Sequence, residues 1–159
     1  KKTLDLVKKD LTIEDVKRAV EVCGKNRIMT LAYFMIGFSW ETEADILSTL
    51  DFAGNLGSDV VEFFFPYPLP GTELYDSAVR DGLIDDENPA PRTQQDAVFI
   101  PKGMSLQQLN QLRDSGRMGL KGSFRAARAM LRQAENPMEF AQITANSLAA
   151  AANALLRNR

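Results

Sequence analysis

The sequence of 159 residues contains no histidine and a single cysteine, Cys23. One thiol cannot form a disulfide within the chain, which fits a reducing compartment such as the cytoplasm. The same shortage excludes a Cys/His zinc site or a three-thiolate iron–sulfur site built from these residues alone. The longest apolar run, Ile28 to Phe38, is too short to span a bilayer, and the first residues are not typical of a signal peptide.

The chain also lacks a strong net charge of either sign, since its formal net charge is −2. This near-neutral charge argues against a nucleic-acid binder. The balance hides an asymmetry. Residues 1–104 carry 11 Lys/Arg against 18 Asp/Glu, whereas residues 105–159 carry 8 against 3. A split of this kind predicts two structural units.

Residues 12–80 alternate between helix and strand patterns. Thr12 with Asp15, and Thr42 with Asp45, match the capping-box pattern, which predicts that a helix begins at each threonine. The run 28–36 is apolar at odd and even positions, so we expect a strand covered on both faces, as in a parallel sheet. The expected order is a helix (12–24), a strand (28–36), a helix (42–57), a strand (59–65) and a helix (72–80). This order predicts a βαβ unit with parallel strands and a right-handed crossover.

The remaining residues differ in character. Residues 84–104 are rich in Asp, Asn, Pro and Gln, which predicts a linker. Residues 105–159 predict helices only, the first capped by Ser105 with Gln108. Basic residues spaced by three or four would share one helix face: Arg113, Arg117, Lys121, Arg125, Arg128 and Arg132. Such a face is usually solvated, but it can dock an acidic partner, and the lack of interleaved aromatic residues disfavours nucleic acid.

Two loops follow the expected strands at their carboxyl ends, where barrels and open α/β sheets place their ligands. The first reads Gly37-Phe38-Ser39-Trp40-Glu41-Thr42, and the second reads Pro66-Tyr67-Pro68-Leu69-Pro70-Gly71-Thr72. Together they resemble the last part of the radical S-adenosylmethionine (SAM) core, where successive strands end in Gly-x-Pro-x-Glu-Thr and Pro-x-Pro-Gly-Thr. The resemblance implies an α/β fold, namely a partial (β/α) barrel with parallel strands over 1–83, followed by the linker and an all-helical C-terminal extension.

The sequence is also similar to the cobalamin-binding branch of that family, including the anaerobic magnesium-protoporphyrin IX monomethyl ester oxidative cyclases. Members of that branch append a basic helical tail that opens like Met104-Ser105-Leu106-Gln107-Gln108-Leu109. Two departures stand in the first loop, where Ser39 replaces the proline and Trp40 replaces a small residue. The family's Cys-x-x-x-Cys-x-x-Cys loop is absent and would lie upstream of Lys1, which starts inside a helical pattern as an excised piece would.

The resemblance implies a parent oxidoreductase, cyclase or transferase that binds SAM and a [4Fe–4S] cluster, with cobalamin as a candidate second cofactor. Because the cluster ligands are absent, we expect this chain alone to bind none of these cofactors and to be inactive. Its implied role is the adenosine-side wall of the SAM site. The residues implied in that wall are Phe34, Ile36, Gly37, Glu62, Phe64, Pro66 and Tyr67.

Several of these residues have a structural explanation beside the functional one. Gly37 either ends a strand or lets a ligand approach the backbone. Glu62 lies in an apolar strand, so it either pairs with a base or points toward the site. For Glu41 we favour stabilisation of the following helix N-terminus over a bond to ribose or substrate. Cys23 is expected to be a small buried hydrophobic residue.

A hypothesis of a different class stays open: a non-catalytic, barrel-derived binding or scaffold module that uses the basic helical tail to hold a partner. The parent reading frame upstream of Lys1 discriminates the two, because the three-cysteine loop there supports the enzyme and a nearby start codon supports the module. A cut parallel sheet also leaves unpaired strand edges. We therefore expect one of three outcomes: the chain self-associates, the tail helices cover an edge, or the edge pairs with the missing N-terminal half of the parent. The parent enzyme would also bind a small-molecule substrate.

Overall fold

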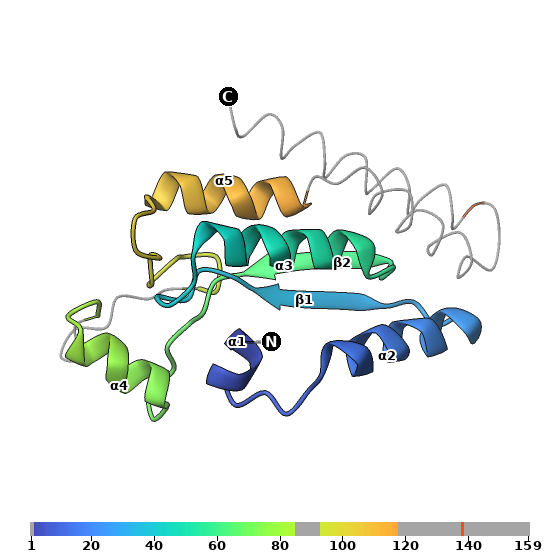
Figure 1. Cartoon of the computed structure of the whole chain (residues 1–159), viewed down its shortest axis with the longest axis horizontal. Coiled ribbons are helices and arrows are strands. Elements are labelled where there is room, and N and C mark those ends of the chain that lie inside the picture. The colour runs from blue at the N-terminus through green and yellow to red at the C-terminus, as the bar shows by residue number, and fades with distance from the viewer. Residues whose placement is uncertain (1, 85–92, 118–137, 139–159) are drawn as a thin grey trace.

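The computed structural model describes residues 2–84, 93–117 and 138 (Figure 1). Its elements are, in order, α1 (Lys2–Leu6), α2 (Ile13–Lys25), β1 (Leu31–Met35), α3 (Glu43–Asn55), β2 (Val60–Phe64), α4 (Glu73–Arg80) and α5 (Leu106–Arg117). Both predicted capping boxes are confirmed, because Thr12 and Thr42 each exchange hydrogen bonds with the aspartate three residues on. Ser105 and Gln108 cap α5 in the same reciprocal way.

The two strands pair in parallel, as predicted, with Leu31 opposite Val60 and Met35 opposite Phe64. Side chains lock this register at the amino ends of the strands. The Asp59 carboxylate accepts hydrogen bonds from the Thr30 N–H (2.9 Å) and hydroxyl (3.1 Å), and the Thr30 hydroxyl accepts one from the Asp59 N–H (3.1 Å). A mixed α/β class is thereby confirmed, whereas the barrel stays a prediction because the described residues supply a two-stranded sheet.

One face of the sheet is covered by α3 and α5, which lie side by side in Figure 1. The main core fills the space between these helices and the strands. Its buried members are Ile36, Ile46, Ala53, Phe63, Phe65 and Leu109. Since Leu109 comes from α5, the described start of the predicted extension belongs to the same core as the βαβ unit.

The opposite face of β1 is open among the described residues. Leu31, Tyr33 and Met35 are 50%, 66% and 49% exposed, whereas Ala32 and Phe34 between them are half-buried. The expectation that β1 would be covered on both faces is therefore wrong for this part of the chain. The reason is that the two packed helices lie on the same side, and these ranges provide no second layer.

The predicted linker is partly packed. Val98 and Phe99 are buried together with Ala78 of α4 in a second, smaller core, and Pro101 is buried as well. Residues 85–92 of that linker, and the predicted helices beyond Arg117, lie outside the described residues. The domain boundaries stay predictions. Within the described ranges, no helix combines the length and apolar character that crossing a membrane requires.

Candidate functional site

The two loops of the resemblance lie next to each other where β1 and β2 end. Met35 and Phe64 are register partners, and the Ile36 N–H donates to the Phe64 carbonyl at 3.0 Å. The ladder therefore extends to Ile36, the residue before Gly37, on one strand and to Phe64, two residues before Pro66, on the other. Both loops leave the same edge of the sheet, the edge at which parallel α/β folds bind their ligands.

A buried carboxylate closes the first loop. Glu41 is 4% exposed, and its Oε2 accepts hydrogen bonds from the backbone N–H groups of Gly37 (2.8 Å) and Phe38 (3.1 Å). Its Oε1 accepts a third bond from the Thr3 hydroxyl of α1 at 3.1 Å. The loop backbone reverses at Gly37, whose φ of +93° favours glycine. Glu41 thus organises the turn itself.

Burial raises the pKa of Glu41 above its ordinary value of 4.5. The three hydrogen bonds from Gly37, Phe38 and Thr3 lower the pKa, and the nearby Asp45 carboxylate raises it further. The role that we favoured from the sequence, stabilising the helix N-terminus, is not what these contacts show. The cap of α3 is Thr42 with Asp45, and Glu41 bonds backward to the turn.

Two aromatic residues of the first loop stack on each other. The ring centroids of Phe38 and Trp40 are 4.7 Å apart with an interplanar angle of 19°. The indole Nε1 of Trp40 is buried and has no hydrogen-bond partner among the described residues. A buried donor without an acceptor costs free energy, so this N–H is suited to an acceptor supplied by a ligand.

The second loop is stiff at its start and open at its end. Pro66 and Pro68 are buried, whereas Leu69, Pro70 and Gly71 are exposed, and Gly71 has a φ of +83°. Thr72 then caps α4 by accepting a hydrogen bond from the Tyr75 N–H at 3.2 Å. Fixed φ angles and buried rings hold the first half of this loop in place.

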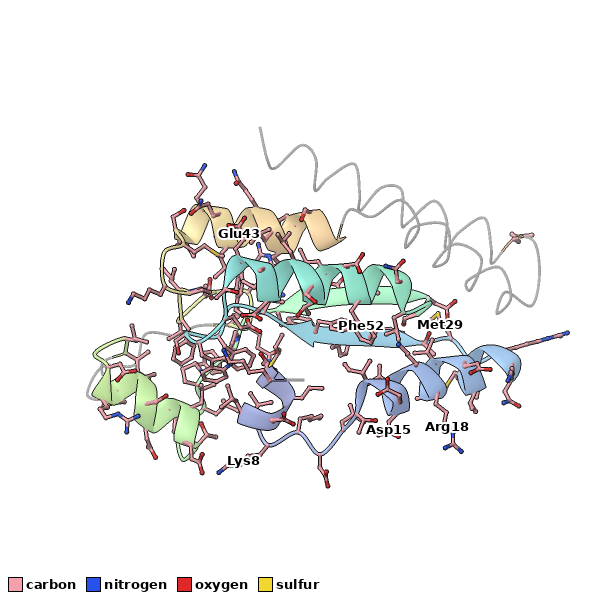
Figure 2. The ribbon with its side chains drawn as sticks, viewed as in Figure 1. Lys8, Asp15, Arg18, Met29, Glu43 and Phe52 are labelled. Carbon is pink, nitrogen blue, oxygen red and sulfur yellow. The ribbon has the colours of Figure 1, made fainter. Side chains whose placement is uncertain are left out.

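Segment 2–8 contacts the first loop and the start of the helix that follows the second loop. Thr3 bonds to Glu41 in the first loop, and Lys8, labelled in Figure 2, forms an ion pair with Glu73 at the start of α4. The ion pair is exposed and contributes little to stability. The contacts of α1 nevertheless place this short helix at the carboxyl ends of the strands.

The open face of the sheet presents an aromatic pair with a carboxylate beside it. Tyr33 and Phe64 meet edge to face, with ring centroids 5.4 Å apart. Glu62 is the register partner of Tyr33, and partners in a ladder point to the same face. Of the predicted site residues, Glu62 and Phe64 therefore lie on the open face. Pro66 and Tyr67 follow directly in the second loop, where Pro66 is buried and Tyr67 is half-buried.

The remaining predicted site residues lie on the helix-covered side. Phe34 packs against Phe52 of α3 and Phe63 of β2, with centroid distances of 6.0 and 5.6 Å. Ile36 is fully buried in the main core. A Cβ on Gly37 would meet Leu109 and Phe65 atoms at 3.1 and 3.3 Å, so packing and backbone angle account for this glycine. The side chains of Phe34 and Ile36 are thus unavailable on the open face. That face instead carries the odd-numbered residues of β1, including Tyr33 and Met35.

Sequence reasoning missed Tyr33, Met35, Leu109 and Arg113. A run that is apolar at both odd and even positions does not show which residues face the helices. The strand register is needed to place Tyr33 and Met35 on the open face. Arg113 was assigned to a basic stripe, but its side chain is 13% exposed and its guanidinium lies 4.9 Å from the Phe65 ring centroid. The stripe residues beyond Arg117 lie outside the described ranges.

The chain resembles two curated enzymes over part of its length. It is 30% identical over 109 residues to an uncharacterized methyltransferase of Pyrococcus horikoshii, which covers 69% of this chain and 24% of that protein. It is 33% identical over 72 residues to the anaerobic magnesium-protoporphyrin IX monomethyl ester cyclase of Rubrivivax gelatinosus, which covers 45% of this chain and 13% of the cyclase. No family model matches the sequence. The chain thus spans about a quarter or less of the length of these two relatives.

Metal-binding side chains do not gather within the described residues. No group of three or more His, Cys, Asp or Glu side chains there is arranged to hold a metal ion. The site at the strand ends therefore consists of backbone N–H groups, aromatic rings, two carboxylates and an unpaired indole N–H. Groups of these kinds can bind an organic ligand by stacking and hydrogen bonding.

Proposed function

We propose that this chain forms part of a radical SAM enzyme and contributes the adenosine-side wall of its SAM site. The observation that carries the proposal is the juxtaposition of the two loops. Motifs about thirty residues apart in the sequence end two parallel strands that are in register, Met35 opposite Phe64. The partial similarity to a methyltransferase and to a magnesium-protoporphyrin cyclase supports the same family.

The described residues fit the nucleoside part of SAM. The exposed ring of Tyr33 and the half-buried ring of Phe64 offer a surface for an adenine ring, and Glu62 on the same face can accept hydrogen bonds from ribose hydroxyls. The buried Trp40 N–H is a further donor at the first loop. When bound in the whole enzyme, SAM and the cluster supply the radical chemistry, while these residues bind and orient the nucleoside.

The same residues do not fit an iron–sulfur cluster, because the sequence offers one thiol and no imidazole. Cluster ligands must therefore come from outside residues 1–159. The family resemblance alone supports cobalamin as a second cofactor of the parent. The reaction and the substrate of the parent likewise depend on that resemblance.

One edge of β1 is unpaired within the described residues, which supports a larger sheet. In a parallel ladder, alternate residues direct their N–H and C=O groups to opposite edges. Thr30 and Ile36 bond to β2, so the odd-numbered Leu31, Tyr33 and Met35 direct theirs away from it. That edge carries no charge, proline or bulge, the features that normally protect an edge strand. We propose that it pairs with a neighbouring parallel strand from the rest of the enzyme.

Nucleoside binding by the chain tests the proposed wall. A ¹H–¹⁵N spectrum of the 159-residue protein would be recorded with increasing 5′-deoxyadenosine, and with uridine as the control nucleoside. We expect weak binding, with a Kd on the order of millimolar because a single wall is present, and amide shifts confined to 37–41 and 62–67. Glu62→Gln should weaken binding several-fold, whereas the matched variant Glu14→Gln, on the exposed first turn of α2, should not.

Two results would contradict the proposal. One is an unchanged spectrum at tens of millimolar nucleoside, or shifts equal to those with uridine. The other is stoichiometric [4Fe–4S] in this chain after anaerobic reconstitution and iron analysis, because a chain that holds the cluster by itself is not the adenosine-side wall alone. The scaffold alternative gains no specific support, since Arg113 of its basic stripe is engaged with Phe65.

A further inference from the structure

We propose that α5 positions both loops of the site, with Leu109 setting the first loop and Arg113 setting the second. This inference rests on the proposed function for the ligand that it names, but the geometry stands without a ligand. It assigns a role in the site to a helix that the sequence places in a separate basic extension. Leu109 and Arg113 touch the ends of the two strands from the covered side, so they act as positioning residues.

Leu109 supports the first loop directly. It is fully buried, and its two δ-carbons lie 3.1 and 3.4 Å from where a Cβ of Gly37 would be. The N–H of Gly37 is in turn held by Glu41 at 2.8 Å. The turn is therefore clamped between a carboxylate that bonds its backbone and a leucine that packs on Gly37. Removing the leucine leaves a space into which the turn can relax.

Arg113 supports the second loop through Phe65, the residue before Pro66. Its guanidinium stacks over the Phe65 ring at 4.9 Å, and its Nη1 donates to the Gln95 carbonyl at 3.0 Å. The adjacent Gln94 carbonyl accepts the Phe65 N–H at 2.9 Å. Arg113 thus ties the end of β2 to segment 93–96, and its stacked, partly desolvated geometry makes the contact stronger than an exposed one.

A third contact fixes the height of α5 above the sheet. A Cβ on Gly116 would lie 2.6 Å from a Phe63 ring atom and 2.7 Å from a Leu50 methyl, so only glycine permits this approach. Leu109, Arg113 and Gly116 are spaced by four and three residues and therefore share one helix face. A rigid helix with three such contacts cannot shift at one loop without disturbing the other.

The consequence is that nucleoside affinity depends on residues that never touch the nucleoside. We would compare Leu109→Ala and Arg113→Met with the unmodified 159-residue chain, using the same spectra and 5′-deoxyadenosine titrations. In Leu109→Ala we expect the Gly37 and Phe38 amides to shift and to lose protection from hydrogen exchange. In Arg113→Met we expect the Phe65 amide to do so instead. Each variant should weaken nucleoside binding by about fivefold or more.

The controls separate positioning from general loss of stability. Val61→Ala removes methyl groups from the same side of β2, but four residues from Phe65, and it should destabilise the fold without moving the loop amides. Leu109→Met keeps the volume and should restore the Gly37 and Phe38 signals. If Val61→Ala moves these amides as much as Leu109→Ala does, or if both helix variants leave them unchanged, the inference is wrong. If the amides respond as expected and the unmodified chain binds no nucleoside, the proposed function fails while the positioning role stands.

Discussion

Replacing Glu41 separates the contribution of its hydrogen bonds from that of its charge. Glu41→Ala leaves the N–H groups of Gly37 and Phe38 buried without an acceptor, and each such group costs about 1–3 kcal/mol. Removing a buried carboxylate offsets part of this loss. We expect the free energy of unfolding to fall by about 2–4 kcal/mol. Glu41→Gln keeps a carbonyl oxygen for both donors and should change it by less than about 1 kcal/mol.

The pH dependence of stability gives an independent test. Since burial raises the pKa of Glu41 above 4.5, the folded chain holds this proton more tightly than the unfolded chain does. The contribution of Glu41 to stability is therefore complete below pH 4.5 and is lost as the pH rises through the folded pKa. Glu41→Gln lacks this titration. Relative to the unmodified chain, the glutamine variant should gain stability as the pH rises from about 4 toward neutral.

Urea unfolding measures both effects in one assay. The single tryptophan, Trp40, stacks on Phe38 in the same turn, so its fluorescence reports on the turn, while circular dichroism reports on the helices. The reasoning is refuted if the glutamine variant is as unstable as the alanine variant at every pH. It is equally refuted if the stability of the glutamine variant relative to the unmodified chain falls or stays constant as the pH rises from about 4 toward neutral.

Three other substitutions test the packing and the strand register. Asp59→Ala removes the two hydrogen bonds from Thr30 to the Asp59 carboxylate and should lower the free energy of unfolding by about 1–2 kcal/mol in urea titrations. An unchanged midpoint would contradict this. Gly116→Ala should lower the free energy of unfolding by about 1–3 kcal/mol, because the added methyl group is overcrowded. Gly24→Ala, at an open helical position, should raise it by about 0.5–1 kcal/mol. Equal shifts in the melting temperature would contradict the proposed packing of α5. Tyr33→Lys should reduce concentration-dependent association in sedimentation velocity with little change in stability, because Tyr33 is exposed at an edge that no other described strand pairs with. An association constant that does not change would exclude this edge as the contact.

Local chemistry explains which features were predictable. The capping boxes at Thr12 and Thr42 depend on residues three apart, and the parallel pairing follows from the order of strand, helix and strand. The two loops were located correctly at the strand ends, because each strand stops where its apolar run meets a glycine or a proline. These features need no knowledge of distant contacts.

The features that escaped prediction depend on contacts between distant residues. The sequence predicted that Phe34 and Ile36 contact the ligand, but they face α3 and α5. A strand that is apolar at every position does not show which alternate residues face the core. Charge balance assigned residues 105–117 to a separate unit, yet Leu109 packs beneath Gly37. A basic helix can present arginines to solvent on one face and a leucine to the core on another, and overall charge cannot distinguish the two.

The alternation of side chains along the two strands has an evolutionary consequence. Even-numbered residues of β1 and odd-numbered residues of β2 pack in the core, so their replacement destabilises the fold whatever ligand the sheet binds. The open face carries a second set of residues that are not part of that core: Leu31, Tyr33 and Met35 on β1, and Glu62 on β2. Residues of the open face can therefore change in evolution while the core set preserves the fold. Related chains should diverge at every second strand position.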